Sequence, residues 1–408
     1  MGNIYNSISA IFFVLLCILS ARRQEFSVRP ALLLPIMLFL LMALSLAWSL
    51  DINSSLRALG KEASLLFIPV AFFLNRRLNR KCTDDILKNY SIAMCVFALY
   101  CVCRAIVRYS SSHNPDVFFY HELSGPGLNA IYCSVLISLA LFEFLSKKHK
   151  TFWGYAAMIF LLVMVFLLSS KNIIVIDVLL IIVYYLFFSG LPKKTAIITT
   201  IVFCIMALGL GYYSKIHERI LHEMQPAIVP TTSTGIHNVT IGEAWHNDKF
   251  ASNHYFNGTA FRVYQIRIFT EMLQEEPILF TGYGLNTSII KIDEKGREHN
   301  IYIGDGKGGQ GYNKFNFHNQ YIEAFADLGI FGFLIVVAAV VINLRNGIKL
   351  KYFVHIAFAI LMISLFLTES FLWRQRGVVF FTLFYCVFNN LQPACPPKKV
   401  QQDPVNAL

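Results

Sequence analysis

One histidine of the chain stands at the start of a long apolar segment, where its side chain can exchange a proton. His318 and Asn319 precede apolar residues at helical spacing, with glycines at Gly329 and Gly332. The pattern predicts that His318 lies at the mouth of a membrane-spanning helix. A histidine there can act as a general base on a hydroxyl group near neutral pH. The alternative is structural: His318 is then an interfacial polar residue that caps the span.

Two arginines lie upstream, on a segment with the apolar spacing of a helix. This spacing is set by Phe261, Tyr264, Ile268 and Met272. It predicts an amphipathic helix over residues 261–273, on the membrane surface or against the helical bundle. Arg262 and Arg267 are five positions apart, so they point to different sides. Arginine matches the geometry of phosphate oxygens, so one of the two can bind an anion. The alternative, for Arg267 above all, is a solvated face or a lipid headgroup contact.

Further charged residues stand at the ends of apolar segments, where charges are costly and often functional. Lys171 follows Ser170 in a short turn between two apolar runs, on the same side of the membrane as the long loop described below. Glu369 and Arg374 lie near the ends of the last two apolar runs. They are candidates for the same site. The alternative is a structural ion pair between Glu369 and Arg374.

Metal and nucleotide chemistry have little support in the sequence. The long loop holds seven histidines, but they lack the helical two-histidine spacing with a carboxylate ligand that a metal site would show. These are His217, His222, His237, His246, His254, His299 and His318. We therefore expect no metal and no cofactor. A phosphate-binding glycine loop is also missing, so any energy must come from the substrate or from an ion gradient.

The composition is that of a membrane protein. Of the 408 residues, 56% are hydrophobic and 14% are charged, and the mean hydropathy is +0.55. An ordinary soluble domain has roughly 25% charged residues. The net charge of +11 is divided among short basic clusters between apolar runs, so we expect no nucleic-acid partner. Most of the nine cysteines lie in or beside apolar runs, and we expect free thiols.

The apolar runs predict an all-α, polytopic membrane helical bundle with about ten to twelve transmembrane helices. The runs cover residues 4–20, 30–50, 64–74, 86–106, 128–145, 152–168, 173–188, 196–213, 328–344, 353–367 and 378–388. Basic clusters fall on alternate connections, which the positive-inside rule assigns to the cytoplasm. The clusters are Arg22, Arg23 and Arg29; Arg76, Arg77, Arg80 and Lys81; Lys147, Lys148 and Lys150; Lys193 and Lys194; Arg345, Lys349 and Lys351; Lys398 and Lys399.

This topology predicts four parts of a bacterial inner-membrane protein. Residues 1–213 form the N-terminal transmembrane helices, and residues 214–318 form a long periplasmic loop with the catalytic motifs. Residues 319–391 form the C-terminal transmembrane helices, and residues 392–408 form a cytoplasmic tail. Loops as long as this one are usually functional.

The long loop has turn signals but no evident apolar core, because its middle is rich in Thr, Gly, Asn and His. Pro277 ends the predicted amphipathic helix, and Gly282 and Gly284 give a turn after it. Residues 304–311 form a second, glycine-rich stretch that we expect to be flexible and able to let the loop move.

In this order, the features resemble the O-antigen ligase and polymerase family of bacterial cell-envelope assembly, over most of the chain. The family's arginine corresponds to Arg262, with Pro277 and the glycine turn after it. The family's histidine and asparagine correspond to His318 and Asn319. A span that ends in a serine and a basic residue corresponds to Ser170 and Lys171. The family usually has arginine at this last position, and lysine lacks its planar fork.

The resemblance implies a metal-independent membrane glycosyltransferase with a glycan donor linked to undecaprenyl diphosphate. Arg262, Lys171 and Arg374 would bind the diphosphate, and His318 would take the proton of the acceptor hydroxyl. The supporting residues would be Asn319, Ser170, Glu369, Gly282 and Gly284. Membrane lipids would surround the bundle, and the apolar bundle would hold the prenyl tail.

Several functions remain open at this point. We favour a ligase, which transfers the glycan to lipid A-core or a similar envelope acceptor. The alternative is a polymerase, which joins lipid-linked repeat units. A transporter for a polyprenyl-linked glycan is a third reading, but repeated halves and midplane charges are not evident. The last reading is a structural scaffold or receptor, in which mutation of His318 would leave glycan assembly intact.

Overall fold

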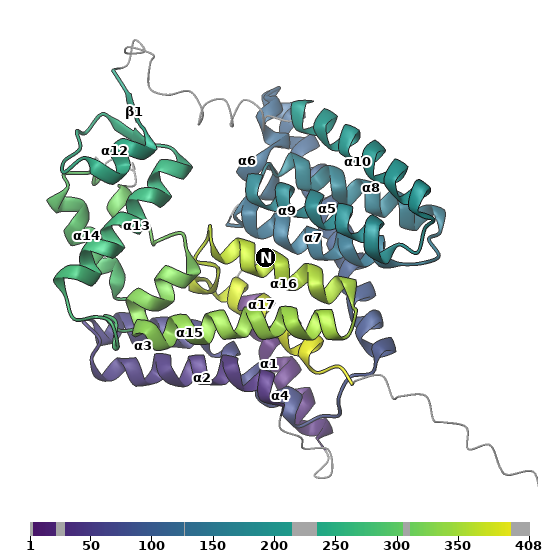
Figure 1. Cartoon of the computed structure of the whole chain (residues 1–408), viewed down its shortest axis with the longest axis horizontal. Helices are drawn as coiled ribbons and strands as arrows, with labels where there is room; N and C mark the ends of the chain where they lie inside the picture. The colour runs from purple at the N-terminus through teal and green to yellow at the C-terminus, as the bar shows by residue number, and fades with distance from the viewer. Residues whose placement is uncertain (1–2, 22–28, 126, 214–234, 305–310, 393–408) are drawn as a thin grey trace, which may run out of the picture.

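The computed structural model of the chain describes residues 3–21, 29–125, 127–213, 235–304 and 311–392. Within these ranges the protein is an all-α polytopic bundle with one small two-stranded sheet (Figure 1). Among the described residues, four helices are long and apolar enough to cross a membrane: Pro30–Ala47, Arg80–Ser112, Lys171–Phe188 and Gln320–Lys349. Shorter apolar helices are Tyr5–Ser20, Ala130–Ser146, Phe152–Leu167 and Phe353–Phe366. Each predicted apolar run coincides with a helix.

One group of helices combines the two ends of the chain. Its members are α1 (Asn3–Ser20), α2 (Pro30–Leu44), η2 (Ser45–Ala47), α3 (Ile52–Glu62), α4 (Ser64–Phe73), α15 (Gln320–Lys349), η6 (Phe371–Trp373) and α17 (Gln375–Asn389). α2 packs against α4 and α15, and α17 packs against α4. Segments that are far apart in the sequence therefore pack together in one group.

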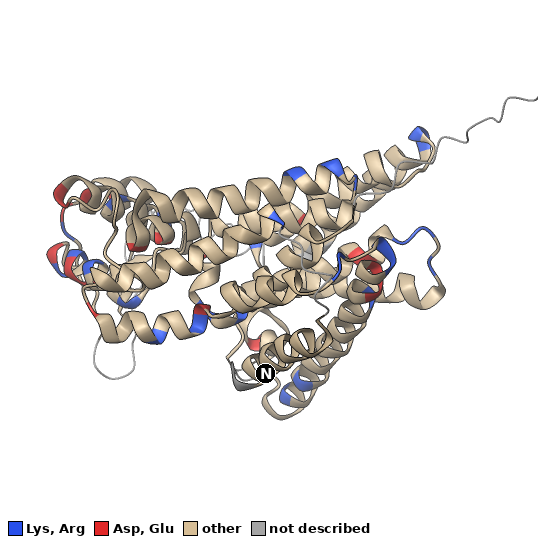
Figure 2. Ribbon diagram, turned by 90° about the horizontal axis from the view of Figure 1, so that it is seen from below, with Lys and Arg blue, Asp and Glu red and all other residues tan. Residues whose placement is uncertain are grey.

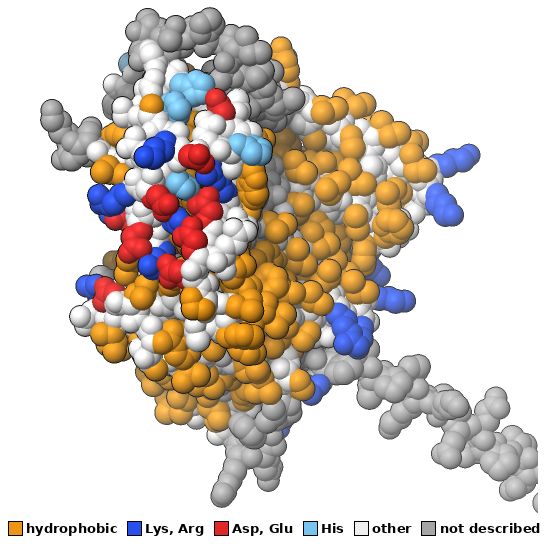
Figure 3. Space-filling model, turned by 60° about the vertical axis from the view of Figure 1, so that its left-hand side comes forward, with side chains coloured by type: hydrophobic (Ala, Val, Ile, Leu, Met, Phe, Trp, Pro, Cys, Tyr) orange, Lys and Arg blue, Asp and Glu red, His pale blue; other side chains and the backbone are white. Residues whose placement is uncertain are grey.

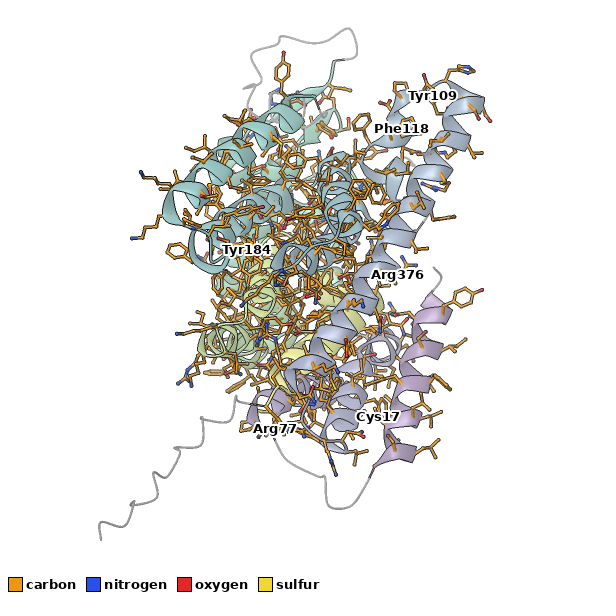
Figure 4. All side chains as sticks on the ribbon, turned by 90° about the vertical axis from the view of Figure 1, so that its right-hand side faces the viewer. Cys17, Arg77, Tyr109, Phe118, Tyr184 and Arg376 are labelled. Carbon is orange, nitrogen blue, oxygen red and sulfur yellow. The ribbon has the colours of Figure 1, made fainter. Side chains whose placement is uncertain are left out.

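The second group of helices comes from the middle of the chain. It contains α5 (Arg80–Ser112), η3 (Pro115–Phe118), α6 (Tyr120–Ser124), α7 (Ala130–Ser146), α8 (Phe152–Leu167), α9 (Lys171–Val183), η4 (Tyr184–Phe188) and α10 (Lys193–Tyr213). α5 connects the two groups. Figure 4 shows Arg77, just before α5, on the side of Cys17 in α1, whereas Tyr109 near the other end of α5 lies beside Phe118.

The helix α16 (Phe353–Phe366) joins the two groups. It contacts α15 on one side and α7 and α9 on the other. Most of its side chains are buried, as expected for a helix surrounded by others. The end of α16 therefore lies where the two groups meet, and the residues that follow it can reach both.

Charges lie mainly toward the two ends of the bundle, and the stretches between them are apolar (Figure 2). The surface of the bundle is largely hydrophobic, whereas the loop carries acidic, basic and histidine side chains together (Figure 3). This division is expected where lipid surrounds the helices and water surrounds the loop. Several predicted features lie outside the described residues: Arg22, Arg23, His217, His222, Lys398, Lys399, residues 305–310 of the glycine-rich stretch and residues 393–408 of the tail.

We call residues 235–304 and 311–317 the loop domain. It contains β1 (His237–Val239), α12 (Ile241–His246), β2 (His254–Phe256), α13 (Gly258–Glu275), α14 (Ser288–Glu298) and η5 (Tyr312–Lys314). The strands β1 and β2 are parallel, and the register pairs His237 with His254, Asn238 with Tyr255 and Val239 with Phe256.

The loop domain has a hydrophobic core, and the expectation that it lacks one was wrong. Phe250, Phe256, Phe261 and Tyr264 are among the residues buried there. They come from separate short stretches, so no single run of the sequence shows the core. The predicted amphipathic helix is α13, and its apolar face packs into this core while it also contacts α15.

The turn after α13 interlocks with α15. At Gly329, which has a φ of 67°, α15 leaves helical geometry. The backbone N–H of Gly284 donates to the carbonyl of Asp327, and that of Ile330 donates to the carbonyl of Leu279. A Cβ atom on Gly282 would lie 2.4 Å from the carbonyl carbon of Asp327, so only glycine fits this approach. The loop domain is thereby fixed to the start of α15.

Candidate active site

A cavity of about 1100 Å³ lies between the loop domain and the bundle. The loop domain contributes β1, β2, the start of α13 and the segment 314–316, with His318 next to them. The bundle contributes α6, the start of α7, the turn between α8 and α9, and the segment 368–374 after α16. In Figure 1 the loop domain lies on one side of the molecule, and α6 and α9 lie on the other.

Arg262 is held in the cavity wall by the first turns of α13. The side chain of Asn257 accepts hydrogen bonds from the first backbone N–H groups of α13 and so starts the helix there. The Nε of Arg262 donates to the carbonyl of Thr368 at 3.0 Å, and Nη1 donates to the carbonyl of Gly258 at 2.9 Å. Its Nη2 forms an ion pair with Glu369 at 3.0 Å. A guanidinium has five N–H groups, so two remain for a ligand.

Glu369 links this arginine to His318. The residue is only 6% exposed, and a buried carboxylate requires partners. Its Oε1 accepts from Arg262, and its Oε2 lies 3.4 Å from Nδ1 of His318. The imidazole ring also packs against Phe261 and Phe315, with centroid distances of 5.9 and 6.0 Å. Because Nδ1 faces Glu369, the other ring nitrogen, Nε2, is left for a ligand.

A tight turn places His318 at the start of α15. The residue has a φ of 48°, in the left-handed region, and its N–H donates to the side chain of Asn316 at 3.2 Å. The side chain of Asn319 accepts from the N–H groups of Tyr321 and Ile322, so it caps α15. Asn319 therefore positions the histidine, and it does not line the cavity.

Lys171 reaches the cavity from the turn between α8 and α9. It is the first residue of α9 and follows the buried Ser170, which also lines the cavity. The neighbouring Asn172 donates to Oγ1 of Thr368 at 2.9 Å and accepts from Oγ of Ser364 at 2.7 Å. These bonds tie the start of α9 to the end of α16, so Lys171 lines the same cavity as Glu369.

Arg374 lines the cavity as an exposed residue at the start of α17. Among the described residues, Glu369 forms an ion pair with Arg262, and its other oxygen lies 3.4 Å from Nδ1 of His318. The structural ion pair between Glu369 and Arg374, offered above as an alternative, is therefore not what the structure has. The cavity thus receives the three predicted basic residues, Arg262, Lys171 and Arg374, and a further one, Lys314 of η5.

Three other residues discussed above lie outside the cavity. Gly282 and Gly284 form the turn that interlocks with α15. Arg267 is 9% exposed, and it donates to Glu271 at 2.7 Å and to the carbonyl of Asn247 at 2.7 Å. It therefore stabilises the loop domain, and neither a solvated face nor a lipid contact describes it.

Two residues that hold the site together, Asn172 and Thr368, were not singled out in the sequence. Asn172 and Thr368 join α9 to α16 and hold Arg262 beside Glu369. Asn172 could have been singled out, because it is a polar residue directly after Lys171, at the start of an apolar span. Thr368 accepts a hydrogen bond from Arg262 through its backbone carbonyl, and the pattern of side chains in a sequence does not reveal such a contact.

The arrangement suits the transfer of a group from an anionic leaving group to a hydroxyl. The basic residues can stabilise negative charge that develops on a departing anion. His318, oriented by Glu369, can accept a proton. Among the described residues, no three His, Cys, Asp or Glu side chains are grouped so that they could hold a metal ion.

Residues 155–337 match the sequence model of a protein family described as O-antigen ligase. The matched range begins in α8 and ends within α15, so it includes Lys171, Arg262 and His318. Glu369 and Arg374 lie beyond it. No curated protein matches the chain.

Proposed function

The chain belongs to the O-antigen ligase family, and from this premise we propose that it is a glycosyltransferase of the ligase type. The proposed reaction moves a glycan from undecaprenyl diphosphate to lipid A-core or a similar envelope acceptor. Proteins of this broad ligase and polymerase type act in membranes on lipid-linked glycans. The observation that carries the finer proposal is the bridge from Arg262 through Glu369 to His318, inside a cavity that also holds Lys171 and Arg374.

The basic residues bind and stabilise the leaving group. When the bond between the anomeric carbon and the phosphate oxygen breaks, its electron pair leaves with undecaprenyl diphosphate. The two free N–H groups of Arg262 and the charges of Lys171 and Arg374 stabilise this anion electrostatically. Lys171 acts as a point charge, because an ammonium cannot form the paired bonds of a guanidinium.

His318 is the general base of the proposed reaction. The acceptor hydroxyl gives its proton to Nε2 of His318 as its oxygen bonds to the anomeric carbon. Glu369 accepts from Nδ1, orients the ring and stabilises the imidazolium that forms. The same carboxylate holds Arg262, so one residue sets the relative positions of the base and of the leaving-group ligand.

The direction of the helices around the loop domain supports a periplasmic location. α10 begins with Lys193 and Lys194 and leads toward the loop domain, and α15 runs away from it to Lys349. Both basic ends thus lie away from the loop domain, as the positive-inside rule requires if the loop is outside. We infer an inner-membrane protein with the four parts 1–213, 214–318, 319–391 and 392–408.

The test is the envelope glycan profile of a deletion strain that is complemented with wild type, His318→Ala or His246→Ala. His246 is exposed on the same loop and lies outside the cavity, so its variant is the control. Loss of a general base is expected to slow transfer by about 10²- to 10⁴-fold. Bare core with long carrier-linked chains in the His318→Ala strain supports a ligase. Core with one repeat unit indicates a polymerase, and an unchanged profile removes His318 from the chemistry.

A further inference from the structure

An exposed aromatic ring stands in the cavity wall without a packing role. Tyr255 is the middle residue of β2, it lines the cavity, and it is 52% exposed. The residues on either side, His254 and Phe256, are half-buried and buried. Aromatic side chains of this size normally bury most of their area. The exposure of Tyr255 inside the cavity leaves its ring available to a ligand.

The small sheet places an amide beside this ring. Successive side chains of a strand point to opposite faces, and paired residues share a face. Val239 and Phe256 are buried, so Asn238 and Tyr255 occupy the opposite face, and the register pairs them directly. Both line the cavity. The sheet thus presents one flat ring and one amide side by side.

Packing fixes this pair relative to the catalytic residues. The hydroxyl of Tyr312 accepts from the N–H of Phe256 at 3.1 Å. The ring of Phe261 lies 5.4 Å from the ring of Tyr312 and 5.9 Å from that of His318. The sheet, the residue before Arg262 and the catalytic histidine therefore belong to one aromatic cluster, and a ligand bound at the sheet has a defined position relative to the reaction.

The chemistry of the pair favours an uncharged, hydroxyl-rich ring. An amide can donate and accept at once, which matches sugar hydroxyl and acetamido groups, while a flat ring covers the apolar face of a pyranose. An anion is disfavoured there, because neither the phenol ring of Tyr255 nor the amide of Asn238 carries a positive charge. A prenyl chain is disfavoured because it would leave Asn238 without a hydrogen-bond partner.

We propose that Tyr255 and Asn238 form a sugar-binding subsite that positions the glycan of the donor or of the acceptor. The inference rests on the proposed function and adds the residues that recognise the carbohydrate, apart from those that bind the diphosphate. Tyr255 supplies the stacking surface, and Asn238 supplies directional hydrogen bonds. The subsite determines which sugars are accepted, and the basic residues and His318 determine the rate of transfer.

The test is steady-state transfer by the purified full-length protein in nanodiscs. The donor is lipid-linked glycan from membranes of the deletion strain, and the acceptor is core lipopolysaccharide from the same strain. Tyr255→Ala is expected to raise one KM by about two- to tenfold, given the usual strength of aromatic contacts. Tyr255→Phe keeps the ring and is expected to remain near wild type, and Asn238→Ala is expected to raise the same KM. A higher KM for the donor shows that the bound sugar belongs to the donor, and a higher KM for the acceptor shows that it belongs to the acceptor.

The control is Trp245→Ala, because Trp245 is an aromatic residue of the loop domain that is 41% exposed and does not line the cavity. A Tyr255→Ala variant with both KM values unchanged, while His318→Ala is inactive, overturns the subsite alone. Transfer that persists in His318→Ala overturns the proposed catalytic site instead. If transfer cannot be reconstituted, saturation-transfer NMR with the repeat-unit oligosaccharide decides: its signal must weaken in Tyr255→Ala and persist in Trp245→Ala, and equal signals contradict the subsite.

Discussion

At the scale of single residues, Glu369 contacts two residues to which the proposed mechanism gives separate functions. Its Oε1 binds Arg262, and its Oε2 faces His318. Removing one partner of a buried charged pair leaves the other charge uncompensated. In the proposed mechanism, a change at Glu369 therefore affects both the base and the leaving-group ligand, although neither residue is altered itself.

We predict that Glu369→Gln lowers kcat by about 10- to 100-fold, part of the full contribution of a general base. Glutamine keeps the size of the side chain, but its neutral amide cannot stabilise an imidazolium as well as a negatively charged carboxylate does. The measurement is transfer against pH, because a positioning residue changes the pH profile and a merely structural one does not. Glu294→Gln is the control, since Glu294 is an exposed partner of Lys291 on the loop domain. A wild-type profile in Glu369→Gln would contradict the role.

The candidate residues that line the cavity could be singled out from the sequence one by one, but their pairing could not. His318, Arg262 and Lys171 stood out because each is polar beside an apolar segment. Glu369 also stood out, yet its expected partner was Arg374, which is near in sequence. The actual partner, Arg262, is 107 positions away. Only the packing of α13 against the end of α16 brings the two together.

At the scale of elements, long apolar helices were predictable and the loop domain was not. The runs in α2, α5, α9 and α15 are long and apolar enough to be seen directly. The core of the loop domain is built from single aromatic residues such as Phe250 and Phe256, on short elements with polar neighbours. Turns and capping residues bring these aromatic residues together. The spacing of residues along the sequence does not show the geometry that results.

The loop domain is expected to lose stability as the pH falls below about 6.5, the ordinary pKa of histidine. Burial lowers the pKa of His299, and the attraction of Glu271 only partly offsets this. The unfolded chain therefore binds this proton more tightly than the folded domain. The stabilisation is present above the unfolded pKa and is lost as the pH falls toward the folded pKa, by at most about 1.4 kcal/mol per pH unit.

Hydrogen exchange of the α13 and α14 amides at pH 7.5 and 5.5 measures this effect, after correction for the intrinsic exchange rate. In His299→Gln the pH dependence should be smaller. Because Nε2 of His299 lies 3.2 Å from Glu271, a protonated ring could instead be held as an ion pair. Protection that increases on acidification would show that this pairing outweighs burial.

At the scale of the whole molecule, the proposed topology has the cavity open on the periplasmic side of the membrane. We predict that a cysteine introduced at the exposed Lys249 of the loop domain reacts with a membrane-impermeant maleimide in intact spheroplasts. The native Cys82, exposed near the basic start of α5, should react only after the membrane is permeabilised. The reverse pattern would invert the topology.

The interlock between the turn at Gly282 and the break in α15 has a consequence for recombination between related proteins. The same turn is also bound to the N-terminal helices, because Trp48 donates to the carbonyl of Thr281 and Ser55 donates to that of Leu285. A graft of the loop domain alone would separate the turn at Gly282 from the α15 backbone that it contacts directly. The smallest exchangeable module is therefore discontinuous: the loop domain, the first part of α15 through Gly329 and the stretch 45–55.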